Sequence, residues 1–282
     1  MARNSPILII GMHRSGTTMM AGLLRRAGVY MGRKLGKNDE ALYFRSLNRW
    51  LLTQAGGSWT YPQPVHDLLE DPPARKLARE YLALQLNAPR FLGYWGIRGT
   101  VHGKKGQAWG WKDPRNTFTL PLWLELFPNA RVIHMERHGV DVAESLYVRR
   151  KRAIKRSQES FTKRHLLYRF APKKTSLLNT PRLAQRERAF ALWEEYLAES
   201  RAHMASLGSQ GLSLDYETFL QDPIREFNKV AEHCGLAIDE RRIAQITSHL
   251  NPERAFAYRS SPELRQFAQD HAQRLEAFGY AP

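Results

Sequence analysis

Residues 7–18 of the 282-residue chain read ILIIGMHRSGTT. The first four residues are apolar and mostly β-branched, which is typical of a strand buried on both faces of a parallel sheet. Gly11 and Gly16 bound a short loop, and small and apolar residues then recur at helical spacing until Gly28. The stretch predicts a strand, a loop and a helix whose backbone N–H groups can surround phosphate oxygens.

The same pattern recurs along the chain. Residues 131–136 are a second predicted strand, followed by a helix from about Val140 to Arg150, and residues 212–216 are a third strand candidate. Strands that alternate with helices predict an α/β fold in three layers, with a P-loop-like parallel sheet flanked by helices. Further helices are predicted at 39–54, 72–86, 121–127, 181–207, 222–233, 240–250 and 261–278, and irregular loops at 56–64 and 93–107. We expect a single domain over residues 1–282, with a largely helical C-terminal portion at 224–282.

Composition indicates a folded chain, because 43% of the residues are hydrophobic and 25% are charged. A peptide hormone and a disulfide mini-protein are excluded. Cys234 is the only cysteine, so no intrachain disulfide and no thiolate zinc site can form. No apolar stretch is long enough to span a membrane or to form the core of a signal peptide. We therefore expect a cytoplasmic protein.

The charge is unevenly distributed. The formal net charge is +16, and residues 149–174, the basic segment, hold eleven Lys or Arg and one acidic residue. Such an excess predicts an anionic partner: a phosphorylated cofactor, an acidic glycan, a membrane surface or nucleic acid. For the basic segment several interpretations stay open: a solvated helix face, an insertion or lid over the site, a peripheral membrane contact, or binding of an acidic glycan or single-stranded nucleic acid.

The glycine loop has the frame of a Walker A motif but lacks its lysine. Thr17 stands where ATP-binding proteins place Lys, and the nearest cation is Arg14, inside the loop. A cation in the loop followed by Ser-Gly-Thr-Thr resembles the 5′-phosphosulfate loop of sulfotransferases. Further on, Arg137 at a strand end and Ser145 eight residues later match the 3′-phosphate motif of that family. The stretches Trp111-Lys112-Asp113-Pro114-Arg115 and 215–223 also resemble segments of bacterial members, in the expected order.

This resemblance implies a donor, 3′-phosphoadenosine-5′-phosphosulfate (PAPS), whose product is 3′-phosphoadenosine-5′-phosphate (PAP), and a reaction without a metal. Arg137 and Ser145 would hold the 3′-phosphate, and Arg14 and Lys112 would assist the departing oxygen. The 5′-phosphosulfate would be bound by His13, Arg14, Ser15, Gly16, Thr17 and Thr18.

The acceptor must lose a proton, and Glu40 is the first candidate for the base, because it matches a glutamate that bacterial relatives place near the start of a helix. His13, Asp113, His66 and His102 are the alternatives. Two family features are missing: no histidine follows Lys112, and no Arg-Lys-Gly cluster occurs near the C-terminus. His134, in the middle of a predicted strand, is interpreted as a core residue.

The leading prediction is a PAPS-dependent sulfotransferase that transfers to a hydroxyl or amine of a small molecule or glycan, with a carbohydrate or glycolipid as the favoured acceptor. Trp59, Tyr61 and Trp95 are aromatic residues suited to stack on sugars or to pack in the core. The alternatives are a P-loop kinase that uses ATP and Mg²⁺, and a basic nucleic-acid-binding protein. No recognised nucleic-acid-binding motif supports the last of these. The oligomeric state stays open.

Overall fold

The computed structural model describes residues 5–101, 107–171, 177–178 and 180–282, without the side chains of 97–101. The chain divides into two compact units. The first combines Met1–Arg137 with Tyr196–Phe256, and the second combines His138–Glu195 with Ala257–Pro282. None of the helices in the described part has both the length and the apolar character needed to cross a bilayer. The expectation of a single domain stays a prediction.

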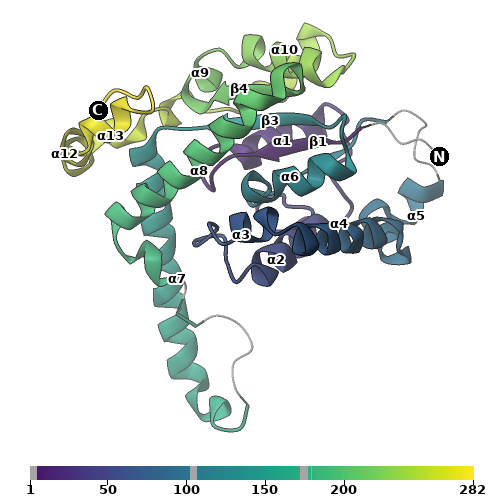
Figure 1. Ribbon diagram of the computed structural model, residues 1–282. Helices are drawn as coiled ribbons and strands as arrows, with labels where there is room; N and C mark the ends of the chain where they lie inside the picture. Colours follow the sequence, from purple (N-terminus) through teal and green to yellow (C-terminus); the bar gives the residue numbers. More distant parts are fainter. Residues whose placement is uncertain (1–4, 102–106, 172–176, 179) are drawn as a thin grey trace. The chain divides into compact units, whose positions relative to one another are not determined.

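A four-stranded parallel sheet lies at the centre of the first unit (Figure 1). Its strands are β1 (Ile7–Ile10), β2 (Gly110–Lys112), β3 (Arg131–Glu136) and β4 (Gly211–Asp215), in the order β2-β1-β3-β4. Ile7 pairs with Gly110 on one side and with Arg131 on the other. Since all four strands run in the same direction, their carboxyl ends share one edge of the sheet, where α/β proteins bind ligands.

Alternation along β1 directs its side chains to two different helical layers. Ile7 and Ile9 belong to an apolar cluster with α1 (Thr17–Arg26), α9 (Tyr216–Gln221), α10 (Pro223–Cys234) and α11 (Glu240–Thr247). Leu8 and Ile10 belong to a second cluster with α2 (Leu42–Gln54), α4 (Pro72–Asn87) and α6 (Asn116–Leu126). Figure 1 shows these two groups of helices on opposite faces of the sheet. The predicted α/β fold with a parallel sheet between helices is confirmed.

Shorter elements complete the first unit: α3 (Val65–Glu70), η1 (Pro89–Phe91), α5 (Leu92–Val101), η3 (Gly208–Gln210) and η4 (Pro252–Arg254). The prediction of an irregular loop over 93–107 is wrong in its first half, because α5 is helical apart from Gly96, whose φ is 71°. Aromatic packing explains the difference. The Tyr94 hydroxyl donates to Gly110 O at 2.6 Å, and the Trp95 ring stacks on Tyr30 with centroids 5.1 Å apart.

The second unit contains α7 (Gly139–Tyr168), η2 (Pro181–Ala184), the start of α8 (Arg186–Leu207), η5 (Ala257–Ser260), α12 (Pro262–Asp270) and α13 (Ala272–Glu276). Asp141 holds α7 to η5 by accepting hydrogen bonds from the backbone N–H groups of Ala257 and Tyr258, at 3.1 and 2.8 Å. Helix α7 continues far beyond the predicted end near Arg150. No glycine or proline occurs between residues 151 and 168, so no helix-breaking residue ends the helix near Arg150, and α7 ends at Tyr168, four residues before Pro172.

Two other predicted helices begin or divide differently. The helix expected over 181–207 begins with the separate turn η2, and the helix expected over 261–278 is split into α12 and α13. The largely helical character predicted for residues 224–282 is confirmed by α10 to α13.

Candidate active site

The loop between β1 and α1 requires glycine at two positions. Gly11 and Gly16 have φ angles of 120° and 96°, which side-chain-bearing residues rarely adopt. A Cβ on Gly11 would lie 2.3 Å from Met135 O, and one on Gly16 would lie 2.6 Å from Cδ2 of Tyr216. The loop therefore lies directly against β3 and α9 at the carboxyl edge of the sheet.

Hydrogen bonds fix this loop to its neighbours. The Ser15 hydroxyl is buried and lies 2.7 Å from both Met12 O and Met135 O, to which it can donate. The Gly11 N–H donates to Oγ1 of Thr117 at 3.1 Å, which joins the loop to α6. Because its proton points to carbonyl oxygens within the protein, the Ser15 hydroxyl contributes to the shape of the loop.

Helix α1 begins at this loop without a cap. No side chain accepts a hydrogen bond from its first N–H groups, and its first turn holds no acidic residue. The first N–H groups of a helix lack partners within the helix and carry a partial positive charge. Thr17 and Thr18 lie in this first turn, and the Thr18 hydroxyl donates to Asn38 O at 3.2 Å. The start of α1 is therefore suited to bind an anion.

Arg14 and Arg137 lie together at the carboxyl edge of the sheet, and Arg254 adds to the positive charge there. Arg137 follows β3 and donates to Arg14 O at 3.4 Å and to Arg254 O at 3.1 Å. Its guanidinium carbon lies 4.6 Å from the Tyr216 ring centroid, and its Nε lies 3.8 Å from Glu217 Oε1. Burial lowers the pKa of Arg14, and the positive charges of Arg137 and Arg254 lower it further. Arg254, in η4, belongs to no recognised motif, so sequence analysis missed it.

Lys112 ends β2 with its side chain buried beside the start of α1. Its ammonium group lies 3.4 Å from Thr18 Oγ1 and 3.3 Å from Glu40 Oε1, and it also donates to Asn38 O. Burial lowers the pKa of Lys112, and the negative charge of Glu40 partly offsets this effect. The other oxygen of Glu40 lies 3.6 Å from the Arg45 guanidinium. The structure thus brings together Lys112, Glu40 and the first turn of α1.

Asp113, one of the candidate bases, is occupied by donors. Its carboxylate is fully buried and accepts hydrogen bonds from the backbone and guanidinium of Arg115, at 3.0 and 3.2 Å, and from Asn48 at 3.1 Å. Asn48 also donates to Asn116 at 2.7 Å. The Asp113 carboxylate is thus part of a buried hydrogen-bond network that joins α2 to the start of α6, and this geometry favours a supporting role for it.

The candidate histidines that the structure describes have different partners. His13 packs edge-on against Trp59, with ring centroids 4.4 Å apart. His66 lies in α3 and pairs with Glu199 of α8 at 3.0 Å. His102 lies outside the described residues. His134 is buried in β3, so the interpretation as a core residue is confirmed. Burial, with a smaller effect of Arg201, lowers the pKa of His134 to about 3.

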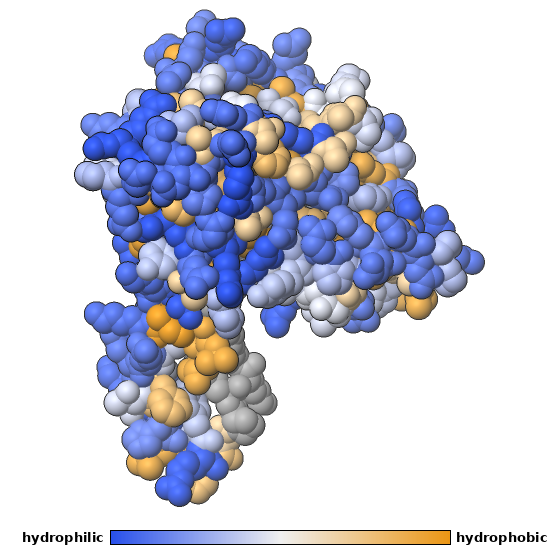
Figure 2. Space-filling view, turned by 60° about the vertical axis from the view of Figure 1, so that its left-hand side comes forward, coloured by the Kyte–Doolittle hydropathy of each residue, from blue (hydrophilic) through white to orange (hydrophobic). Residues whose placement is uncertain are grey.

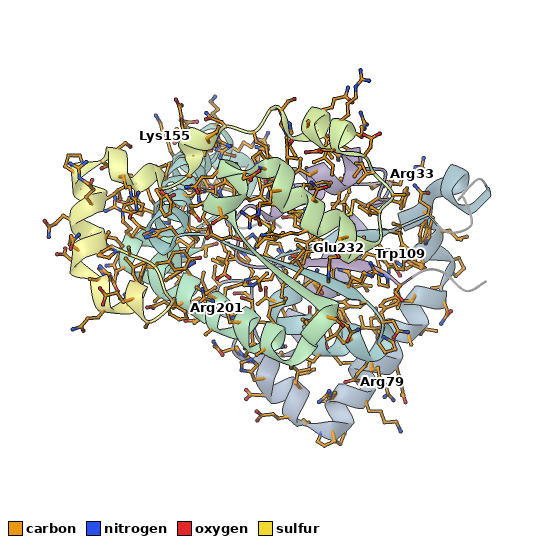
Figure 3. The ribbon with its side chains drawn as sticks, turned by 90° about the horizontal axis from the view of Figure 1, so that it is seen from above. Arg33, Arg79, Trp109, Lys155, Arg201 and Glu232 are labelled. Carbon is orange, nitrogen blue, oxygen red and sulfur yellow. The ribbon has the colours of Figure 1, made fainter. Side chains whose placement is uncertain are left out.

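Two further residues complete the account of the predicted motifs. Asp215 accepts a hydrogen bond from the Thr218 N–H at 2.7 Å and so caps α9, a structural role. Arg201 of α8, labelled in Figure 3, pairs with Glu136 at the end of β3 at 2.6 Å. Ser145 belongs to α7 in the second unit, and its contribution to a 3′-phosphate site stays a prediction.

A parallel sheet, an uncapped helix at a glycine loop and several cations at the carboxyl edge form an arrangement suited to bind an anionic ligand. Comparison with known families identifies the class of protein. A family profile described as "Sulfotransferase family" matches residues 6–240. The chain belongs to the sulfotransferase family and is therefore a transferase.

Several solved structures are similar to this chain. The sulfotransferase domain from the curacin biosynthetic pathway has a TM-score of 0.50 and 12% identity, covering 95% of this chain and 98% of its own. The sulfotransferase domain of the Synechococcus PCC 7002 olefin synthase has a TM-score of 0.49 and 18% identity, and the match covers 96% of this chain and 95% of that domain. A sulfotransferase from Alicyclobacillus acidocaldarius has a TM-score of 0.48 and 16% identity, and the match covers 99% of this chain and 96% of that protein. Comparison with curated protein sequences returned no significant match.

Proposed function

We propose that this sulfotransferase moves the sulfuryl group of PAPS to a hydroxyl or amine of an acceptor, by in-line displacement and without a metal. One observation carries the proposal: the field of three arginines beside an uncapped helix start. Burial lowers the pKa of Arg14 most, and the positive charges of Arg137 and Arg254 lower it further, so keeping these cations charged together here has a cost in free energy. A ligand with several negative charges, such as PAPS, would remove that cost.

In this proposal the donor is held from two directions. The loop amides, Arg14 and the hydroxyls of Thr17 and Thr18 bind the 5′-phosphosulfate, which would lie at the positive end of α1. Arg137 binds the 3′-phosphate, with the planar donor geometry that suits phosphate oxygens. Ser145, which the sequence motif pairs with Arg137, is proposed for the same phosphate.

The chemistry is assigned to the buried pair next to α1. The acceptor oxygen forms a new bond to sulfur while the bond between sulfur and the bridging phosphate oxygen breaks, releasing PAP. Glu40 takes the acceptor proton, and Lys112 and Arg14 stabilise the negative charge that develops on the departing oxygen. Lys112 supports both assignments, since its ammonium group touches Thr18 on one side and Glu40 on the other.

The acceptor is proposed to be a carbohydrate or a glycolipid. Two aromatic residues support this choice. Trp59 packs on His13 of the loop, and Tyr61, two residues later, is 54% exposed. Aromatic faces of this kind can stack on sugar rings. Trp95, the third candidate, is instead stacked on Tyr30. The cytoplasmic location stays a prediction.

Calorimetry with PAP and with ADP tests the donor, because only PAP carries the 3′-phosphate. PAP should bind the metal-free protein more tightly than ADP, and Arg137→Ala should weaken PAP binding at least about tenfold, as the loss of a charge-assisted contact implies. Arg79→Ala, which removes an α4 arginine at the periphery (Figure 3), is the matched control and should change nothing. A preference for ADP with Mg²⁺ would refute the proposal and favour a kinase.

A further inference from the structure

The end of α7 exposes large apolar side chains. Leu166 is 59% exposed, Leu167 is 64% exposed and Phe170, just beyond the helix, is 90% exposed. We call these three residues the apolar tip. Figure 2 shows hydrophobic side chains interspersed with hydrophilic ones over the surface that α7 and the segment after it form. Contiguous exposed apolar residues of this size mark a surface that contacts something else.

The apolar tip shares one helical face with basic residues. Residues three, four or seven positions apart lie on the same side of a helix. Arg156, Lys163 and the tip follow this spacing, because Lys163 lies seven residues after Arg156 and four before Leu167. Arg156 and Lys163 are exposed, and so are Arg164 and Arg169 beside the tip. Glu159, which is also exposed, lies on the same face between Arg156 and Lys163 and is the one acidic residue of the basic segment. This face of α7 is therefore apolar at its end and carries a net positive charge along its length.

The charge identifies the occupant of this face. The basic segment has a net charge of +10, so two copies of the chain would repel each other there. A lipid bilayer with anionic headgroups matches both the apolar tip and the positive charge of this face. Aliphatic and aromatic side chains enter the boundary of the acyl chains, while Lys and Arg remain at the headgroups. We propose that the end of α7 docks on an anionic lipid bilayer. This inference is independent of the donor and of the acceptor.

Vesicle sedimentation with the full-length protein tests the docking. The protein should bind vesicles of equal parts phosphatidylcholine and phosphatidylglycerol and should not bind pure phosphatidylcholine. Replacing Lys163, Arg164 and Arg169 with Gln should weaken binding roughly one-hundredfold, since each basic residue near such a surface contributes about fivefold. The triple substitution L166S/L167S/F170S should weaken it more than about tenfold through loss of apolar burial.

The matched control is L77S/L84S, which removes two exposed leucines of α4, 68% and 63% exposed, and should bind vesicles like the parent. Circular dichroism of each variant checks that it folds. Binding that falls with salt but is unchanged in L166S/L167S/F170S would indicate a purely electrostatic contact, as with nucleic acid, and would overturn the proposal. A solution dimer that dissociates in the same variant, without vesicle binding by the parent, would overturn it in favour of self-association.

Discussion

Replacing Asn48 with Leu should remove about 5 kcal/mol from the free energy of unfolding. The Asn48 side chain is fully buried and makes four hydrogen bonds: it donates to Asp113 and Asn116 and accepts from Thr119 at 2.9 Å and Trp123 at 2.8 Å. Four bonds at about 1 kcal/mol each give about 4 kcal/mol. Trp123 adds about 1 kcal/mol more, because the described residues offer its indole N–H no other acceptor. Leucine has a similar volume, so no large cavity contributes.

Urea unfolding followed by tryptophan fluorescence measures this loss. The control is Asn87→Leu, which removes one exposed bond to Ala83 O at the end of α4 and should change stability by less than about 0.5 kcal/mol. A loss below about 1 kcal/mol for Asn48→Leu would refute the reasoning, because it would mean that the buried partners find other hydrogen bonds without cost.

Three further predictions concern the site and the sheet. Gly16→Ala should lower the free energy of unfolding by about 2 kcal/mol, because of its positive φ and its contact with Tyr216, and should weaken PAP binding in calorimetry. The control Gly22→Ala, which has open space around it, should change neither stability nor binding. Equal effects of the two substitutions would contradict the loop geometry. The folded-state pKa of His134, about 3 against 6.5 unfolded, means that acid protonates only the unfolded chain in this range, so stability falls by about 1.4 kcal/mol per pH unit below 6.5. Urea midpoints at several pH values should show a shallower slope in His134→Gln, and an unchanged slope would exclude this assignment. Glu40→Gln should slow turnover at saturating PAP at least about one-hundredfold, whereas unchanged turnover would assign the base elsewhere.

The parts of the fold that sequence analysis predicted are those with a strong local pattern. The apolar run of β1, its glycine loop and the apolar alternation of α1 are each complete within a few residues. Strand β2 has no such pattern: it is three residues long and ends in a lysine, and it is a strand because it pairs with β1. Tertiary pairing of this kind cannot be recognised within a short window.

The candidate site shows the same division. Motifs located Arg14 in the loop after a predicted strand and Arg137 just after another. Lys112 was located by the resemblance of residues 111–115 to a segment of bacterial family members. Arg254 and Asn48 were missed, since their roles depend on segments far apart in the chain: Arg254 O accepts from Arg137, and Asn48 reaches the residues that follow β2. The predicted end of α7 near Arg150 was wrong, because the charged residues that follow have good helix propensity and continue the helix to Tyr168.

The bonds of Ser15 to Met12 and Met135, with that of Gly11 to Thr117, have a consequence for the rate and thermodynamics of binding. A loop already held in one conformation loses little conformational entropy when an anion enters, and no slow rearrangement has to precede the encounter. Association should therefore follow a single fast phase, with differences between ligands expressed in how quickly they leave. The loop between β1 and α1 therefore has its binding conformation before the ligand binds.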